Sequence, residues 1–422
     1  MKEIILHYLW LHKRIFATQL KTTKGEELQI LNFGFYQQNS GPDFFNAQLI
    51  IAHQKWAGNI EMHVKSSDWY LHHHETDSAY DNVILHVVWE HDVEVYRKDT
   101  TEIPVLELKN FVAPELIYSI KKLVEQNKWI NCEDFIAKTD DFKFLKWKEQ
   151  LFVERLQNKQ QFVNQVFEKA DRNWEATTFI LLAKNFGLNY NGDNFKEMMR
   201  SIPYAVLQKE RFEKENLEAL FFGVSGLLSV TVDDFYFEKL NTIWQYQKIK
   251  YQLTENPSVK PQFYKLRPDN FPTIRLAQLA ALFSKFSNLF EQIIELKSVE
   301  NASKLFFVDI SNYWKTHYNW EKTRKTKNSN LSRSFIELLL INTVIPLQFS
   351  YSNYLGTNDI EKIIAFQTKL KSEHNTIINN FKAIGITSKN AFDSQSLLQL
   401  KNEYCTKKQC LRCVVGIQFL KN

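Results

Sequence analysis

Two carboxylates near the N-terminus have the type and spacing that bind a divalent cation. Asp43 stands just before one apolar run, and Glu61 lies inside the next. This spacing suits two neighbouring strands joined by a turn near Gln54 to Gly58. Mg²⁺ and Mn²⁺ prefer oxygen ligands, so the pattern predicts a Mg²⁺ or Mn²⁺ site made by Asp43, Glu61 and the carbonyl of Met62. Such an ion activates bound water and stabilises charge on a phosphate that is being cleaved.

The same two residues also have a purely structural interpretation. Asp43 follows Gly41-Pro42, and Asp side chains commonly bond the backbone of a turn. Glu61, between Ile60 and Met62, fits the ordinary alternation of a strand with one polar face. Both interpretations of the pair stay open at the level of sequence.

Five histidines accompany these carboxylates: His63, His72, His73, His74 and His86. A zinc or iron site built from His63, His74 and a carboxylate is a second metal hypothesis. His86 lies inside the apolar run VILHVV, which predicts a hydrogen-bonded core histidine. His72 and His73 are predicted to be solvated.

The order Asp43, then Glu61-Met62-His63, on strands followed by a helix and a further strand, resembles the signature of PD-(D/E)XK nucleases. That resemblance implies metal-dependent hydrolysis of phosphodiester bonds in DNA or RNA, with Asp43 and Glu61 as metal ligands. His63 stands where the family has lysine. A neutral imidazole can orient or deprotonate water but lacks a permanent positive charge. Lys65, two residues further along the same strand face, is the candidate source of that charge.

The cysteines form a second group of potential metal ligands. Cys405, Cys410 and Cys413 give C-x4-C-x2-C, and the only other cysteine is Cys132. Basic neighbours stabilise thiolates, and four thiolates suit tetrahedral Zn²⁺ or an iron–sulfur cluster. One distant cysteine plus a C-terminal trio resembles the iron–sulfur staple of some RecB-type nucleases, although order and spacing differ. Reduced core thiols are the alternative.

The elements that must position these residues change in type along the chain. Up to about residue 110 the runs are short and β-like, with a leading helix and an inserted helix or ordered loop after Lys65. Beyond that, long amphipathic helical patterns dominate. The expected class is α+β: a PD-(D/E)XK-like α/β domain with a mixed sheet over residues 1–125, and an all-α domain over 126–422 that carries the cysteine cluster.

Basic residues interleaved with aromatic residues mark the helical part. Lys146, Lys148, Arg267 and Arg275 are predicted to contact a phosphate backbone, while a neighbouring aromatic ring stacks on bases. The alternative is structural: aromatics at helical spacing form the core, and the lysines between them lie on the solvated face. Arg275, directly ahead of an apolar helix, then pairs with an acid.

Composition excludes several classes of protein. Hydrophobic residues make up 44% and aromatic residues 14%, which excludes a disordered chain. A net charge of +5 permits a nucleic-acid partner without requiring one. The motifs of P-loop, dinucleotide-binding, α/β-hydrolase and HExxH proteins are absent. No apolar run approaches the roughly 20 residues of a membrane span, so we expect no membrane partner and a cytoplasmic location.

The whole chain also resembles an uncharacterised bacterial family known only as a domain of unknown function. The residues that carry this resemblance are GPDFFNA, IEMHVKSSDW with the histidines that follow, and YCTKKQCLRC. The sequence therefore predicts a metal-dependent nuclease. Two alternatives stay open: a non-catalytic scaffold that binds nucleic acid or protein, and a His/carboxylate metalloenzyme with another kind of substrate.

Overall fold

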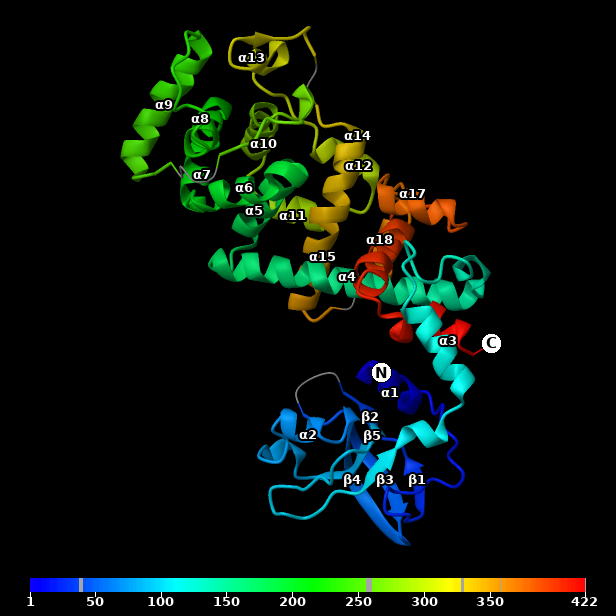
Figure 1. Cartoon of the computed structure of the whole chain (residues 1–422). Coiled ribbons are helices and arrows are strands. Elements are labelled where there is room, and N and C mark those ends of the chain that lie inside the picture. Colours follow the sequence, from blue (N-terminus) through cyan, green and yellow to red (C-terminus); the bar gives the residue numbers. More distant parts are fainter. Residues whose placement is uncertain (38–40, 256–259, 328–329, 358, 422) are drawn as a thin grey trace. The chain divides into compact units, whose positions relative to one another are not determined.

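The chain divides into two units. The computed structural model describes residues 1–37, 41–255, 260–327, 330–357 and 359–421 (Figure 1). The α/β unit comprises residues 1–147, 384–386 and 400–422, and the helical unit comprises 148–383 and 387–399. An N-terminal mixed sheet and a large helical part confirm the expected α+β class.

The α/β unit extends beyond the range 1–125 expected from the sequence, because residues 126–147 and the C-terminal segment pack into it. Phe135 stacks on Phe419, with ring centroids 4.2 Å apart, and Trp147 meets Tyr404 edge-on at 4.9 Å. Composition changes along the chain cannot reveal a C-terminal segment that returns to the first unit.

A mixed sheet in the order β1-β3-β4-β5-β6, with β2 beside β3, forms the frame of the α/β unit. Strands β1, β3 and β4 are antiparallel neighbours, whereas β4, β5 and β6 run parallel. The strands are β1 (Leu28–Asn32), β2 (Phe35–Tyr36), β3 (Phe44–Ile51), β4 (Gln54–Lys65), β5 (Val83–Glu90) and β6 (Val105–Glu107).

Strand β4 is buried on both faces, so its side chains are packed from both sides. Ile60 and Met62 belong to the apolar core that includes α1 (Glu3–Leu11). Alternation places Glu61 and His63 on the other face. That face lies by α2 (Asp68–Leu71) and the short 3₁₀ helix η1 (Ser78–Tyr80), the crossover from β4 to the parallel strand β5.

The turn between β3 and β4 is not where the sequence suggested. Ile51 pairs with Gln54, so the turn consists of Ala52-His53, both with positive φ (48° and 69°). The expected turn at Gln54 to Gly58 is wrong, since these residues already belong to β4.

Further helical elements complete the α/β unit. They are η2 (Leu108–Phe111), α3 (Pro114–Val124), η3 (Ile136–Lys138), the π-helical turn η6 (Leu400–Cys405), η7 (Cys410–Arg412) and α19 (Val414–Phe419).

The helical unit surrounds one large apolar core, and sequence signals start several of its helices. Asn173 caps α5, Asp234 caps α9, and Pro272 begins α10. One small hairpin, β7 (His317–Asn319) with β8 (Lys322–Thr323), interrupts the otherwise helical unit. The helices are α4 (Asp141–Lys169), α5 (Trp174–Phe186), α6 (Leu188–Arg200), α7 (Tyr204–Glu210), α8 (Lys214–Val224), α9 (Phe235–Tyr251), η4 (Pro268–Asn270), α10 (Pro272–Lys285), α11 (Leu289–Ile294), α12 (Val299–Leu305), α13 (Asn312–Thr316), α14 (Arg333–Leu339), η5 (Leu340–Val344), α15 (Ile345–Tyr354), α16 (Ile360–Gln367), α17 (Thr376–Ala383) and α18 (Ala391–Gln399).

One helical stretch, Arg333–Tyr354, is long and apolar enough to cross a membrane by length and composition. However, 67% of its most apolar window is buried inside the protein. Such burial is typical of a core helix, and in the described part of the chain no other helix passes the same test.

Candidate functional site

Asp43 and Glu61 are held together by reciprocal backbone hydrogen bonds. Asp43 stands just before β3, and its backbone N–H donates to Glu61 Oε2 at 3.1 Å. The backbone N–H of Met62 donates in turn to Asp43 Oδ2, also at 3.1 Å. The structure therefore brings the two sequence-predicted carboxylates to one place at the start of β3.

Two imidazoles, those of His63 and His74, lie beside Glu61, and that of His72 lies against His63. His63 Nε2 is 3.0 Å from His72 Nδ1 and 3.6 Å from Glu61 Oε1, and His74 Nε2 is 3.5 Å from the same Glu61 oxygen. The ligand nitrogens of the three histidines all lie within 4.8 Å of one another. Ligand atoms about 2.1 Å from one transition metal lie about 3.0–3.4 Å apart, so the 3.0 Å between His63 Nε2 and His72 Nδ1 matches a single ion, and a wider neighbour would have to move inward.

The chain reversal after α2 explains why neighbouring histidines point in different directions. His73 has φ of 59°, in the left-handed region, and its side chain is 82% exposed. After this reversal the backbone N–H of His74 donates to the carbonyl of Trp69, and the His74 ring stacks on Tyr80 at 3.7 Å. His74 is thereby turned back towards the sheet, with 10% of its side chain exposed.

Burial keeps the imidazoles neutral. Desolvation, reinforced by neighbouring histidines, lowers the pKa of His63 to about 2, that of His74 to about 4 and that of His86 to about 3. Neutral imidazole is the form that binds metal. Desolvation and the charge of Asp43 raise the pKa of Glu61 to about 9. A bound cation would favour its ionised form.

His86 orients His63. Its side chain is fully buried, and its Nε2 lies 2.8 Å from His63 Nδ1. If His63 Nε2 binds a metal, Nδ1 carries the proton and donates it to His86. The prediction of a hydrogen-bonded core histidine at position 86 is thus confirmed. His72, predicted to be solvated, is exposed yet has one ring nitrogen against His63.

A second group of potential ligands was missed at the sequence level. The ligand atoms of Glu3, His7 and Asp43 all lie within 4.8 Å of one another, and His7 Nε2 is 3.0 Å from Asp43 Oδ2. Glu3 and His7 share one face of α1 because they are four residues apart. The four-residue spacing was visible in the sequence. It indicates a ligand pair only once α1 is known to pack on the sheet, because that packing brings both side chains to Asp43.

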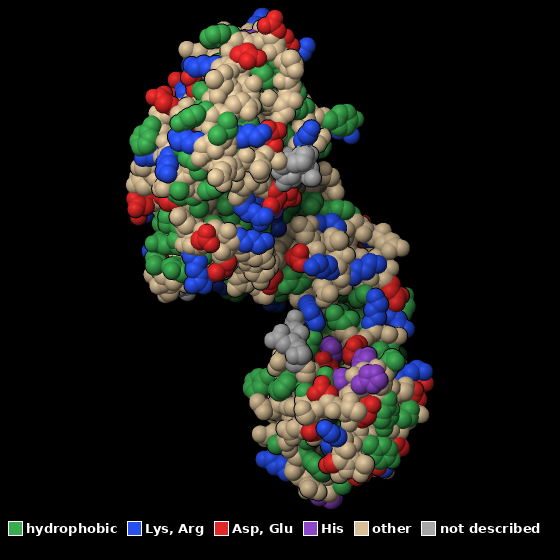
Figure 2. All heavy atoms as spheres, turned by 90° about the vertical axis from the view of Figure 1, so that its left-hand side faces the viewer, with side chains coloured by type: hydrophobic (Ala, Val, Ile, Leu, Met, Phe, Trp, Pro, Cys, Tyr) green, Lys and Arg blue, Asp and Glu red, His purple; other side chains and the backbone are tan. Residues whose placement is uncertain are grey.

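A chain of polar contacts continues from this group to the C-terminal segment. Tyr36 Oη lies 3.3 Å from His7 Nδ1, and Arg412 Nη2 donates to the same hydroxyl at 2.8 Å. On the face of the α/β unit shown in Figure 2, histidine side chains (purple) gather next to acidic side chains (red). The candidate site thus reaches the surface.

Lys65 is not part of this cluster. It is exposed at the last position of β4, where its register partner is Glu90. Asp43, Glu61, His63 and His74 are brought together as predicted, whereas the expected lysine charge lies at the far end of the strand.

The basic residues proposed for nucleic-acid contact have mixed environments. Lys148 forms an ion pair with Asp393 at 2.6 Å. Arg275 is 7% exposed, and its guanidinium lies 3.7 Å from the centroid of the Phe335 ring. Both positions favour structural roles. Lys146 and Arg267 are exposed, and the Lys146 ammonium lies 6.0 Å from the centroid of the Phe142 ring.

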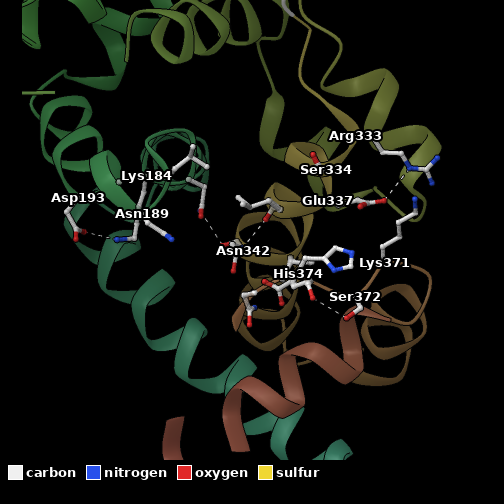
Figure 3. A pocket seen from close by; sticks show the side chains of 17 residues that line it. Lys184, Asn189, Asp193, Arg333, Ser334, Glu337, Asn342, Lys371, Ser372 and His374 are labelled. Atoms are coloured by element: carbon white, nitrogen blue, oxygen red, sulfur yellow. Dashed lines mark hydrogen bonds and ion pairs between the residues drawn. The ribbon is translucent and has the colours of Figure 1, made fainter. Parts of the chain in front are cut away.

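A cavity of about 1010 Å³ in the helical unit contains none of the predicted site residues (Figure 3). Its charged lining is partly neutralised by internal pairs, Lys184 with Asp193 at 2.7 Å and Arg333 with Glu337 at 3.3 Å. The four cysteines, in contrast, are brought together: they line one small cavity of the α/β unit.

Comparison with known proteins assigns the chain to a family. No curated protein and no solved structure matches the chain. A family model with the description "Protein of unknown function (DUF2851)" matches residues 3–376, a span that includes both ligand groups of the α/β unit. The chain therefore belongs to this family, DUF2851.

Proposed function

We propose that the chain is a metal-dependent hydrolase that cleaves phosphodiester bonds in nucleic acid, with its active site on the α/β unit. The observation that carries the proposal is the reciprocal bonding of Asp43 and Glu61 beside the His63 and His74 nitrogens. This arrangement collects two carboxylates and neutral imidazoles around β4, the central strand of the sheet.

The order of elements supports the PD-(D/E)XK resemblance. A leading helix, antiparallel strands β3 and β4, a helical crossover and the parallel strand β5 follow one another along the chain. In that comparison Asp43 and Glu61 take the ligand positions on adjacent strands. Glu3, from the leading helix, lies where it can add a further carboxylate.

The donor set fits Mn²⁺ better than Mg²⁺. Glu61 would supply a hard oxygen beside the borderline nitrogens of the histidine group, and Asp43 groups with Glu3 and His7. Such mixtures of carboxylate and imidazole suit Mn²⁺, Fe²⁺ or Zn²⁺. The bound ion supplies an activated water and stabilises charge on the phosphate. The chain's own residues hold the ligands: His86 orients His63, and backbone N–H groups fix both carboxylates.

His7 is the residue placed to move a proton. Its Nε2 lies 3.0 Å from Asp43 Oδ2, and its Nδ1 faces the Tyr36 hydroxyl. An imidazole between a carboxylate and a phenol can accept a proton on one nitrogen while the other is held in place. This arrangement supports a role as general base or acid in place of the missing lysine.

A second candidate is a metalloenzyme that acts on a substrate other than nucleic acid. The group of three imidazoles, His63, His72 and His74, favours it, because an oxygen-ligated Mg²⁺ site does not need them. It shares the same metal residues, so only the choice of substrate separates the two candidates.

The test is metal-dependent cleavage by the full chain. After chelation, addition of Mn²⁺ should restore cleavage of single- or double-stranded DNA or RNA, and Asp43→Asn should abolish it. The matched control is Asp99→Asn, an exposed turn residue far from the ligand set in sequence, which should retain activity. Hydrolysis of small phosphoesters alone would favour the second candidate. Metal binding without any hydrolysis would leave the non-catalytic scaffold.

A further inference from the structure

Four free cysteines from two distant parts of the sequence meet in the α/β unit. Cys132 lies in the loop between α3 and η3, and Cys405 ends the π-helical turn η6. Cys410 begins η7, and Cys413 follows directly after it. All four line one cavity of about 10 Å³, the room of a single water-sized sphere. Most of the chain separates Cys132 from the other three cysteines, yet all four side chains line the same cavity. Core thiols that pack independently of one another do not need to meet in this way.

The groups around the sulfurs are hydrogen-bond donors. The backbone N–H groups of Gly416 and Val415 face the Cys413 sulfur. The buried indole N–H of Trp147, which also faces Cys413, finds no oxygen or nitrogen acceptor among the described residues. N–H donors are well matched to a thiolate and poorly matched to a thiol.

The spacing of the sulfurs bears on which metal they suit. Among the described residues, the groups of three or more ligands within 4.8 Å of one another are the two near Asp43 and Glu61, and the cysteines form no such group. Four sulfurs about 2.3 Å from one zinc ion would lie about 3.8 Å apart. An iron–sulfur cluster holds them wider apart because iron and sulfide occupy the centre. A zinc ion would therefore have to draw the sulfurs inward, whereas a cluster would have to widen a cavity that has room for one water-sized sphere.

We propose that Cys132, Cys405, Cys410 and Cys413 bind a thiolate-ligated metal centre, an iron–sulfur cluster or a zinc ion, that fastens the C-terminal segment to the α/β unit. The local backbone is built for close approach, since a Cβ at Gly416 would overlap the carbonyl oxygen of Cys410. The centre would also fix the turn that carries Arg412, whose guanidinium donates to Tyr36.

The direct test is the metal content of the full chain purified without oxygen. We expect stoichiometric iron with acid-labile sulfide and visible absorption, or stoichiometric zinc that a His74→Ala variant retains, since the histidine group could also hold zinc. Either result supports the centre and identifies its chemistry. Removal of the metal should lower the melting temperature by several degrees, because the clasp closes a loop of most of the chain.

Matched variants locate the centre. Cys410→Ser and Cys132→Ser should each lose the metal, whereas Lys408→Asn, in the same turn at a position with positive φ, should keep it. If the serine variants fail to fold, the metal content of the His74→Ala variant, whose cysteines are intact, still decides the question. A wild-type chain that contains no iron, sulfide or zinc, and takes none up on reconstitution, would overturn the proposal.

Discussion

Replacing Glu61 by Gln should reduce metal-dependent cleavage by on the order of 10³-fold or more, because it removes a charged metal ligand while keeping the shape of the side chain. The amide oxygen of Gln can still accept the backbone N–H of Asp43, so the start of β3 should remain in place. The loss should therefore appear in turnover and metal affinity and not in the melting temperature.

The control for this variant is Glu90→Gln, an exposed carboxylate at the end of the neighbouring strand β5. Initial cleavage rates, measured over a range of Mn²⁺ concentrations, should be unchanged in the control. A Glu61→Gln enzyme with the wild-type rate would mean that hydrolysis takes place elsewhere on the chain.

Gly223→Ala should strongly destabilise the helical unit. A Cβ at this position of α8 would lie closer than 3.0 Å to Cδ2, Cε2 and Cε3 of Trp244, a separation that Cβ atoms essentially never show. Trp244 is 1% exposed, so its rigid ring has little room to move. Overpacking lowers the free energy of unfolding by about 1–3 kcal/mol and occasionally more. We expect a loss near the upper end of that range for Gly223→Ala. The denaturant concentration at the midpoint of equilibrium unfolding should therefore be lower than that of the wild type.

A double-mutant cycle isolates the clash. Trp244→Leu alone should destabilise by creating a cavity, but in that background Gly223→Ala should cost far less because the indole is gone. Additive effects of the two changes would contradict close packing of α8 against α9 at this point.

The sheet was largely predictable, and the error in it has a clear cause. Apolar runs marked the strands, and the spacing of Asp43 and Glu61 implied adjacent strands. The turn was misplaced because Gly58 resembled a turn residue. Gly58 lies within β4, where a Cβ would come 2.5 Å from Ile84 Cγ2 and 2.6 Å from the carbonyl oxygen of Asn82. The actual turn, Ala52-His53, carries no glycine or asparagine that would announce it.

The histidine cluster was predictable only in part. His63 and His74 were singled out from their types and order, but the separate directions of His72, His73 and His74 depend on the reversal at His73. Helix periodicity alone cannot supply that reversal. Glu3 and His7 join the site through packing of α1 against the sheet, which is a tertiary contact.

The roles of the basic residues also depended on tertiary contacts that the sequence does not reveal. Arg275 and its neighbours have the composition of a phosphate-binding stretch, yet the guanidinium of Arg275 is buried against Phe335 and donates to Gln278 and Asn270. Sequence pattern cannot separate a buried arginine that donates to side chains of its own unit from an exposed one, because both follow aromatic residues at helical spacing.

The most direct test of the metal site is Mn²⁺ binding by the chelator-treated full chain, measured by calorimetry. The arrangement around Glu61 predicts binding that His74→Ala weakens by roughly 10–100-fold or more. His73→Asn is the matched control, since His73 is exposed and asparagine tolerates its left-handed backbone. It should bind Mn²⁺ like the wild type. Equal affinity in both variants, or no binding by the wild type, would contradict a metal centre at these residues.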